Sequence, residues 1–98
     1  MKKVSLFEPN ISKLEKKIVL QSLNENQISS YGYFTTLFEN ESKKITNSKY
    51  NLATNSGSSA LFLALKSVGV KKNEIVLTQS YTFAATINAI ILNNSIPL

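Results

Sequence analysis

The sequence predicts an α/β fold with a parallel sheet flanked by helices, and the sheet is incomplete within these 98 residues. Apolar helices alternate with short strand-like runs after Asn47, an order that specifies parallel strands with helical crossovers. The apolar run Ile75–Leu77 is typical of a strand buried on both faces. Only two full strands and the start of another are predicted, and two parallel strands leave open edges. We therefore expect the chain to be the first part of a longer domain.

The first half of the chain, residues 1–48, is predicted to form a helical arm. Ser12 followed by Glu15 is a capping box, and apolar residues at helical spacing predict a helix from Ser12 to Asn24. A polar loop follows, and a second helix is predicted from Thr35 to Thr46. Its apolar side chains are expected to face inward; these are Phe34, Leu37, Phe38 and Ile45.

The second half, residues 49–98, is predicted to begin an α/β domain. A helix is expected to open at Ala60 and to end near Gly69, which suits a left-handed C-cap. The remaining elements alternate in type. They are a strand at Tyr50–Thr54, a strand at Glu74–Thr78, a helix at Thr82–Leu92 and the beginning of a further strand at Ile96–Leu98.

The residue types exclude several kinds of chemistry. The chain has no cysteine, so disulfides and thiolate reactions are excluded. It has no histidine, so the commonest metal ligand and the commonest general base are absent. Every acidic residue is a glutamate and every basic residue is a lysine, so the chain contains no aspartate and no arginine.

The formal net charge of +5 raises the possibility of a nucleic-acid or membrane-surface partner. However, the lysines are scattered in pairs on polar stretches, and no arginine is present for bidentate contacts with phosphate or guanine. Solvated helix faces explain this pattern better, so we expect neither nucleic acid nor a membrane as partner. The N-terminus lacks the apolar core of a signal peptide, and a cytoplasmic location is the default expectation.

The segment Asn55–Ala60 consists of small and polar residues between a predicted strand and a predicted helix. A helix start presents unsatisfied amides and a partial positive charge, and small residues allow an anion to approach them. The segment is therefore a candidate phosphate cradle. A serine-rich helix cap in which Gly57 simply makes the turn is the alternative, and the segment alone favours that alternative.

The segment Tyr81–Ile90 follows the second predicted strand at the carboxyl end of the sheet, where open α/β sheets bind ligands. Phe83 is placed to lie against a flat heteroaromatic ring. Taken alone, Phe83 is better explained as ordinary core at a helix start. Together, the cradle and the aromatic residue suit a ligand with a phosphate and a planar ring. Pyridoxal phosphate is such a ligand, and so are nucleotides.

Two motifs occur in a fixed order, Ser56-Gly57-Ser58-Ser59-Ala60-Leu61 and then Thr82–Ile90. Three upstream elements accompany them, namely Phe7-Glu8-Pro9, Ile28–Gly32 and Phe38-Glu39. Over nearly the whole chain these residues resemble the DegT/DnrJ/EryC1/StrS sugar aminotransferases. The usual forms of the two motifs in that family are Ser-Gly-Thr-x-Ala-Leu and Thr-Phe-x-Ala-Thr-x-Asn-Ala-Ile. Serine at position 58 in place of threonine keeps the hydroxyl group.

The resemblance implies the fold of aspartate aminotransferase, known as fold type I. Residues 1–48 would be its N-terminal helical arm, and residues 49–98 would begin its large domain, which binds pyridoxal 5'-phosphate. Enzymes of this family transfer an amino group, usually from glutamate, to a nucleotide-linked keto-sugar. They work as homodimers, and their usual setting is nucleotide-sugar or polysaccharide biosynthesis.

The resemblance also implies roles for individual residues. Three residues would meet the cofactor phosphate, and they are Gly57, Ser58 and Ser59. Phe83 would stack on the pyridine ring. Four residues would lie along the sugar-nucleotide pocket, and they are Asn26, Gln27, Ile28 and Ser29.

Two parts of the family's catalytic machinery are expected beyond Leu98, namely the Schiff-base lysine and the aspartate that pairs with the pyridine nitrogen. We therefore expect these 98 residues alone to lack catalytic competence, and no residue of the chain is predicted to be catalytic. The alternative is a stand-alone module that binds a phosphorylated ligand, or that regulates, without catalysis. Basic nucleic-acid binding is the weakest hypothesis, because no recognition motif is present.

Overall fold

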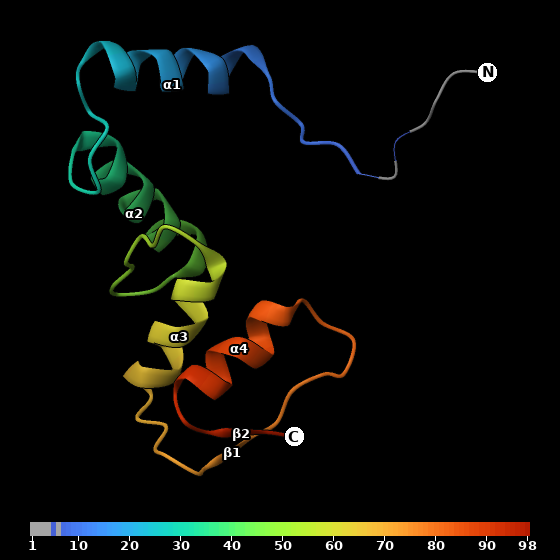
Figure 1. Ribbon diagram of the computed structural model, residues 1–98. Helices are drawn as coiled ribbons and strands as arrows, with labels where there is room; N and C mark the ends of the chain where they lie inside the picture. The colour runs from blue at the N-terminus through green and yellow to red at the C-terminus, as the bar shows by residue number, and fades with distance from the viewer. Residues whose placement is uncertain (1–4, 6) are drawn as a thin grey trace. The chain divides into compact units, whose positions relative to one another are not determined.

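A computed structural model of the chain describes Ser5 and residues 7–98. The first residues of the predicted arm, 1–4 and 6, lie outside the described residues. The chain divides into two compact units, Met1–Asn51 and Leu52–Leu98. Unit 1 contains helices α1 and α2, and unit 2 contains α3, β1, α4 and β2 (Figure 1). In the described part of the chain, no helix has the length and apolar content needed to cross a membrane.

Helix α1 of unit 1 spans Lys13–Asn24, and the predicted capping box is confirmed. The Ser12 side chain accepts a hydrogen bond from the Leu14 amide at 3.0 Å, and Glu15 Oε2 accepts one from the Ser12 amide at 2.7 Å. The Ser12 hydroxyl also donates to the Glu15 carboxylate. These bonds supply partners for amides at the helix start, which explains why the helix begins here.

Helix α2 spans Tyr33–Thr46 and so begins two residues before the predicted Thr35. Its N-cap, Gly32, has no side chain, and Gln27 Oε1 instead accepts a hydrogen bond from the Tyr33 amide at 3.0 Å. The helix ends at Asn47, whose φ of 50° is left-handed. This reversal is common at helix C-termini and is tolerated by asparagine.

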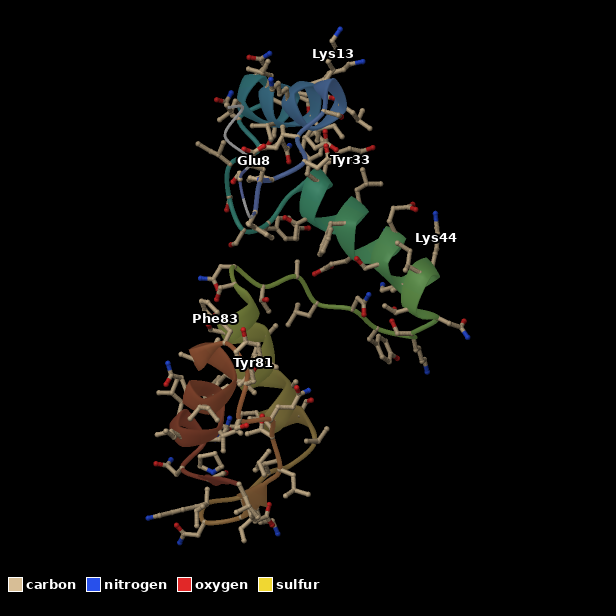
Figure 2. The ribbon with its side chains drawn as sticks, turned by 90° about the vertical axis from the view of Figure 1, so that its right-hand side faces the viewer. Glu8, Lys13, Tyr33, Lys44, Tyr81 and Phe83 are labelled. Atoms are coloured by element: carbon tan, nitrogen blue, oxygen red, sulfur yellow. The ribbon has the colours of Figure 1, made fainter. Side chains whose placement is uncertain are left out.

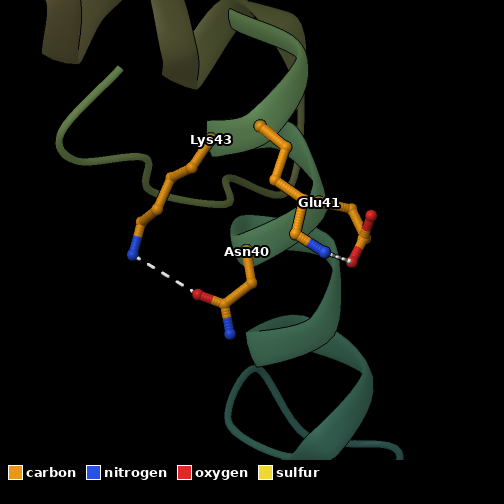
Figure 3. A network of polar contacts seen from close by, with 4 residues as sticks. Asn40, Glu41 and Lys43 are labelled. Atoms are coloured by element: carbon orange, nitrogen blue, oxygen red, sulfur yellow. Dashed lines mark hydrogen bonds and ion pairs between the residues drawn. The ribbon is translucent and has the colours of Figure 1, made fainter. Parts of the chain in front are cut away.

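In the described part of unit 1 most charged side chains are exposed, as the sequence predicted, while Glu39 and Lys43 are half-buried. Lys13 on α1 and Lys44 on α2 point away from their helices (Figure 2). Near the end of α2, Lys44 forms an exposed ion pair with Glu41 at 2.6 Å, and Lys43 Nζ lies 3.5 Å from Asn40 Oδ1 (Figure 3). Exposed pairs of this kind contribute little to stability, about 0–1 kcal/mol.

The prediction that the apolar side chains of α2 face inward is wrong for most of them. Phe34 is half-buried, but Phe38 is 62% exposed and Ile45 is 85% exposed. Unit 1 contains only two helices in its described part, and no element of the unit covers this side of α2. Helical spacing identified the apolar residues, but it does not supply the surface that would bury them.

Unit 2 has the alternating order that the sequence predicted. Helix α3 spans Gly57–Ser67 and α4 spans Ala84–Leu92, while the strands are β1 at Ile75–Val76 and β2 at Ile96–Pro97. The strands pair in parallel, with Ile75 opposite Ile96, so the predicted parallel arrangement is confirmed. Helix α4 connects the end of β1 to the start of β2 (Figure 1). Gly69 follows α3 with φ of 80°, which confirms its predicted left-handed conformation.

Two strand predictions need correction. Tyr50–Thr54 is not a strand, and Tyr50 and Leu52 are 76% and 75% exposed. Strand β1 is also shorter than the predicted Glu74–Thr78. A strand exists only where a neighbour accepts and donates its backbone hydrogen bonds, and the sheet of the described residues contains only β1 and β2. Residues 50–54 are therefore not part of the sheet in the described part of the chain.

The core of unit 2 lies where α3 packs on α4. Ala89 and Ile90 of α4 are each 2% exposed, and two polar residues, Asn93 and Ser95, are buried beside them. The sheet face that carries Ile75 and Leu77 is exposed, at 62% and 79% for these two side chains. Parallel sheets are normally covered on both faces, but the described residues of unit 2 cover only one face of this sheet.

We expect the cap of α1 to depend on pH. The Ser12 hydroxyl, helped by the backbone amides of Glu15 and Ser12, lowers the pKa of Glu15 from its ordinary value of 4.5. The cap should therefore stabilise α1 at pH values above 4.5 and disappear as the pH falls through the lowered pKa. Amide chemical shifts of residues 13–16 during an acid titration measure this loss. Glu15→Gln is the control, because glutamine can still cap but has no proton to take up; an unchanged acid step in this variant would contradict the assignment.

We expect Gly69→Ala to lower the free energy of unfolding of unit 2 by about 1–2 kcal/mol, because an L-residue is disfavoured in the left-handed region. The φ of Gly69 is 80°, and an added Cβ would meet nothing within 4 Å, so the whole effect belongs to the backbone. Urea denaturation measures the change. Gly69→Asn is the matched variant and should lose less, because asparagine tolerates this conformation. Equal losses in both variants would show that backbone strain is not the cause.

Candidate functional site

The segment after Thr54 forms a helix start, as predicted from its small residues. Ser56 is the N-cap of α3, with an extended backbone at φ −161° and ψ 158°. Its side chain accepts a hydrogen bond from the Ser59 amide at 3.2 Å, and its carbonyl accepts one from the Ala60 amide at 3.1 Å. The Thr54 hydroxyl donates to the same carbonyl at 3.0 Å. Because Ser56 caps the helix, α3 begins at Gly57, three residues before the predicted start at Ala60.

Two backbone donors at this helix start are free. Within the described residues, the amides of Gly57 and Ser58 take part in no hydrogen bond. They occupy the first two positions of α3, where the helix itself offers no acceptor. An added Cβ on Gly57 would meet nothing within 4 Å, and its φ is not left-handed, so neither a turn nor a neighbour in the chain requires glycine here. The arrangement leaves an open approach to two amides at the positive end of a helix.

The donors of Ser59, the third predicted phosphate-binding residue, are used inside the loop. Its amide is bound by Ser56, and its hydroxyl donates to Asn55 Oδ1 at 2.8 Å. Since a hydroxyl has one proton, the 3.1 Å contact between the Ser56 and Ser59 hydroxyls must have Ser56 as donor. Asn55, Ser56 and Ser59 thus form a connected chain of hydrogen bonds at the start of α3.

Phe83 lies at the start of the next helix. It is the N-cap residue of α4, its carbonyl accepts a hydrogen bond from the Thr86 amide at 3.0 Å, and its side chain is 83% exposed. The alternative that Phe83 is ordinary core therefore does not hold within unit 2. Helices α3 and α4 begin on the same side of the unit, away from β1 and β2 (Figures 1 and 2). The free amides and Phe83 share that side.

The four residues predicted for a sugar-nucleotide pocket belong to unit 1. Asn26 has a left-handed φ of 55°, and the Gln27 amide donates to the Ser22 carbonyl at 2.8 Å. Ile28 is 74% exposed, and Ser29 is exposed as well. The structure thus places them in a surface loop after α1, in a different unit from Gly57, Ser58, Ser59 and Phe83.

Sequence reasoning missed the local roles of two residues. Gln27 caps α2 through its side-chain oxygen, and Asn55 accepts the Ser59 hydroxyl. A signal for the first exists in the sequence, because the glycine before Tyr33 cannot cap the helix with a side chain. In the described part of the chain, no group of three or more histidine, cysteine, aspartate or glutamate side chains is arranged to hold a metal ion.

Comparison with known proteins finds a family model and several relatives. Residues 9–98 match the DegT/DnrJ/EryC1/StrS aminotransferase family. GDP-perosamine synthase of Escherichia coli O157:H7 is 30% identical over 98 residues, which are 100% of this chain and 27% of that protein. The chain therefore spans about a quarter of the length of the curated relatives that it matches.

Two solved structures resemble the chain closely. The aminotransferase from Psychrobacter cryohalolentis has a TM-score of 0.82 and 27% identity over 92% of this chain and 23% of that chain. NtdA from Bacillus subtilis, solved with bound cofactor PMP, has a TM-score of 0.78 and 25% identity over 90% of this chain and 21% of that chain. The fold is that of the N-terminal part of pyridoxal phosphate-dependent aminotransferases, and the chain belongs to the DegT/DnrJ/EryC1/StrS aminotransferase family.

Proposed function

We propose that this chain supplies the phosphate-binding part of a pyridoxal phosphate-dependent aminotransferase. The reaction that we propose for the complete protein transfers an amino group from an amino acid, glutamate in the first instance, to a nucleotide-linked keto-sugar. Family membership supports the reaction type. The name of the related GDP-perosamine synthase supports an amino sugar attached to a nucleotide as the product.

The observation that carries the proposal is the pair of free amides at Gly57 and Ser58. They stand at the N-terminus of α3, where the helix dipole favours an anion. Gly57 has open space at its Cβ position, and the chain has no conformational need for glycine there. Close approach of a ligand to the backbone explains that glycine. The residues present therefore fit a phosphate group.

Pyridoxal phosphate supplies an electron sink for amino transfer when it is bound. Three groups would hold its phosphate by donating hydrogen bonds, namely the backbone amides of Gly57 and Ser58 and the hydroxyl of Ser58. Phe83 would lie against its ring, which explains an aromatic side chain that is 83% exposed at a helix start. Ser59, with its donors already engaged by Asn55 and Ser56, would contribute mainly by fixing the loop.

Other parts of the proposal rest on the resemblance. We propose that the loop containing Asn26, Gln27, Ile28 and Ser29 lies along the sugar-nucleotide pocket of the complete protein. Its exposure in unit 1 is compatible with contact to a substrate. A homodimer and a cytoplasmic location remain predictions from the sequence and the family.

We propose that residues outside this chain provide the cofactor-binding lysine and the aspartate for the pyridine nitrogen. The chain has no aspartate. Lys66, the lysine within α3, lies in the last turn of the helix, and its Nζ sits 5.7 Å from the centre of the Phe62 ring. That position is at the opposite end of α3 from Gly57, so Lys66 is unsuited to a reaction at the phosphate site. The 98 residues alone should therefore show no amino transfer.

We expect Gly57→Ala to weaken binding of pyridoxamine phosphate about tenfold, or ~1.4 kcal/mol, because the added methyl occupies the approach to the free amides. Pyridoxamine phosphate is the probe, since its amine does not condense with the chain's lysines. Titration followed by amide chemical shifts gives the affinity and should move the Gly57 and Ser58 signals most. Folding should not suffer, because the methyl meets nothing within 4 Å. Ser67→Ala, at the opposite end of α3, is the control and should leave the affinity unchanged; a wild-type chain whose Gly57 and Ser58 signals stay still would refute the phosphate site.

We expect Phe83→Ala to weaken binding of pyridoxamine phosphate by about 0.5–1.5 kcal/mol, the contribution of an aromatic pair beyond burial. The same substitution should leave binding of inorganic phosphate unchanged, because the ring does not touch the phosphate. Tyr81→Ala is the matched control, since Tyr81 is 96% exposed and lies two residues before Phe83. The same amide titration measures all three proteins. A Tyr81 effect as large as the Phe83 effect would show that stacking is not specific.

A further inference from the structure

Asn93 is a buried polar residue that joins two helices. It follows α4 as the C-cap residue and is 2% exposed. Its side-chain nitrogen donates to the Ala89 carbonyl in α4 at 2.9 Å and reaches the Phe62 carbonyl in α3 at 3.5 Å. In the described part of unit 2, this is the one side-chain hydrogen bond that ties the end of α4 to α3.

The oxygen of the same side chain has no partner. Asn93 Oδ1 is buried and accepts no hydrogen bond. Turning the amide over would not help, because both groups facing its nitrogen are carbonyl oxygens, which cannot donate. A buried acceptor without a donor destabilises the folded state. A leucine of similar size would fill the same space without that penalty, so stability alone does not explain asparagine here.

The two helices that Asn93 joins carry the two halves of the site. Helix α3 begins with the free amides of Gly57 and Ser58, and α4 begins directly after Phe83. The fully buried apolar residues among those described, Ala89 and Ile90, both belong to α4, and the burial of apolar side chains is non-directional. A hydrogen bond to a single carbonyl is directional and does fix the position of one helix along the other.

We propose that Asn93 is a positioning residue that sets the register of α4 on α3. The register fixes how far Phe83 stands from the free amides of Gly57 and Ser58, and it therefore matches the site to a ligand with a ring and a phosphate. This inference rests on the proposed function for its ligand, but the register itself is a property of unit 2. A polar group kept at a loss of stability is typical of a functional constraint.

The test is Asn93→Leu in the full chain, with two readouts that a merely structural role would move together. Thermal unfolding followed by circular dichroism should show an unchanged or higher midpoint, because the unpaired oxygen is removed. Affinity for pyridoxamine phosphate should fall about tenfold, while affinity for inorganic phosphate should stay the same. Asn88→Leu is the matched control on the exposed side of α4 and should leave both affinities unchanged. A lower midpoint for Asn93→Leu, or an unchanged affinity for pyridoxamine phosphate, would overturn the proposal.

A ligand-free measurement separates this proposal from the proposed function. The chain has no cysteine, so spin labels can be placed specifically after Leu63→Cys in α3 and Asn88→Cys in α4. The distance distribution between the labels should be narrow with Asn93 and broader or shifted with Asn93→Leu. If the wild-type chain fails to bind pyridoxamine phosphate, the proposed function fails, and the label distances still decide whether Asn93 sets the register. Identical distributions in the two proteins would refute the register.

Discussion

The parallel pairing of β1 with β2 is the constraint on which unit 2 depends. The Ile96 amide donates to the Glu74 carbonyl at 2.9 Å, and the Leu98 amide donates to the Val76 carbonyl at 3.0 Å. Two parallel strands cannot be joined by a tight turn, so the chain between them must cross over, and here it does so through α4. The crossover carries the chain from the end of β1 to the start of α4, on the side away from the strands, and back along α4 to β2. Helix α3 packs beside it with its start on the same side, which puts Phe83 and the free amides of Gly57 and Ser58 on one side of unit 2.

Local signals in the sequence predicted local structure well. The Ser12 and Glu15 capping box and the left-handed Gly69 each depend on a few neighbouring residues, and both are present; α3 starts at Gly57, three residues before the predicted Ala60. The predicted strand at Tyr50–Thr54 does not form, because a strand requires a neighbouring strand and the sheet of the described residues contains only β1 and β2. The prediction that Phe38 and Ile45 face inward was wrong for a similar reason, because a side chain is buried only where a second surface packs on it.

In the candidate site, too, features set by neighbouring residues were predictable, and features that depend on the spatial arrangement were not. Small residues after an extended segment predicted the helix start, and the motif around Phe83 added the aromatic side chain through the resemblance. The internal use of the Ser59 donors was not predictable, because the direction of a hydroxyl bond depends on where Asn55 and Ser56 lie in space. The burial of Asn93 against α3 was equally unpredictable, because the sequence of an asparagine after a helix does not indicate where its side chain lies. The loop from Asn26 to Ser29 was assigned to a pocket only by the resemblance, and its place beside a substrate stays a prediction.

The left-handed turns of this chain have a thermodynamic consequence. Four of the five described residues with a left-handed φ are asparagines, namely Asn26, Asn47, Asn73 and Asn94, and the fifth is Gly69. Asparagine has fewer accessible backbone conformations than glycine when the chain is unfolded, so folding loses less entropy at each of these positions. The mild strain of a left-handed asparagine offsets part of that gain. Sharp reversals after α1, α2 and α4 are thus built mainly from residues that restrict the unfolded chain.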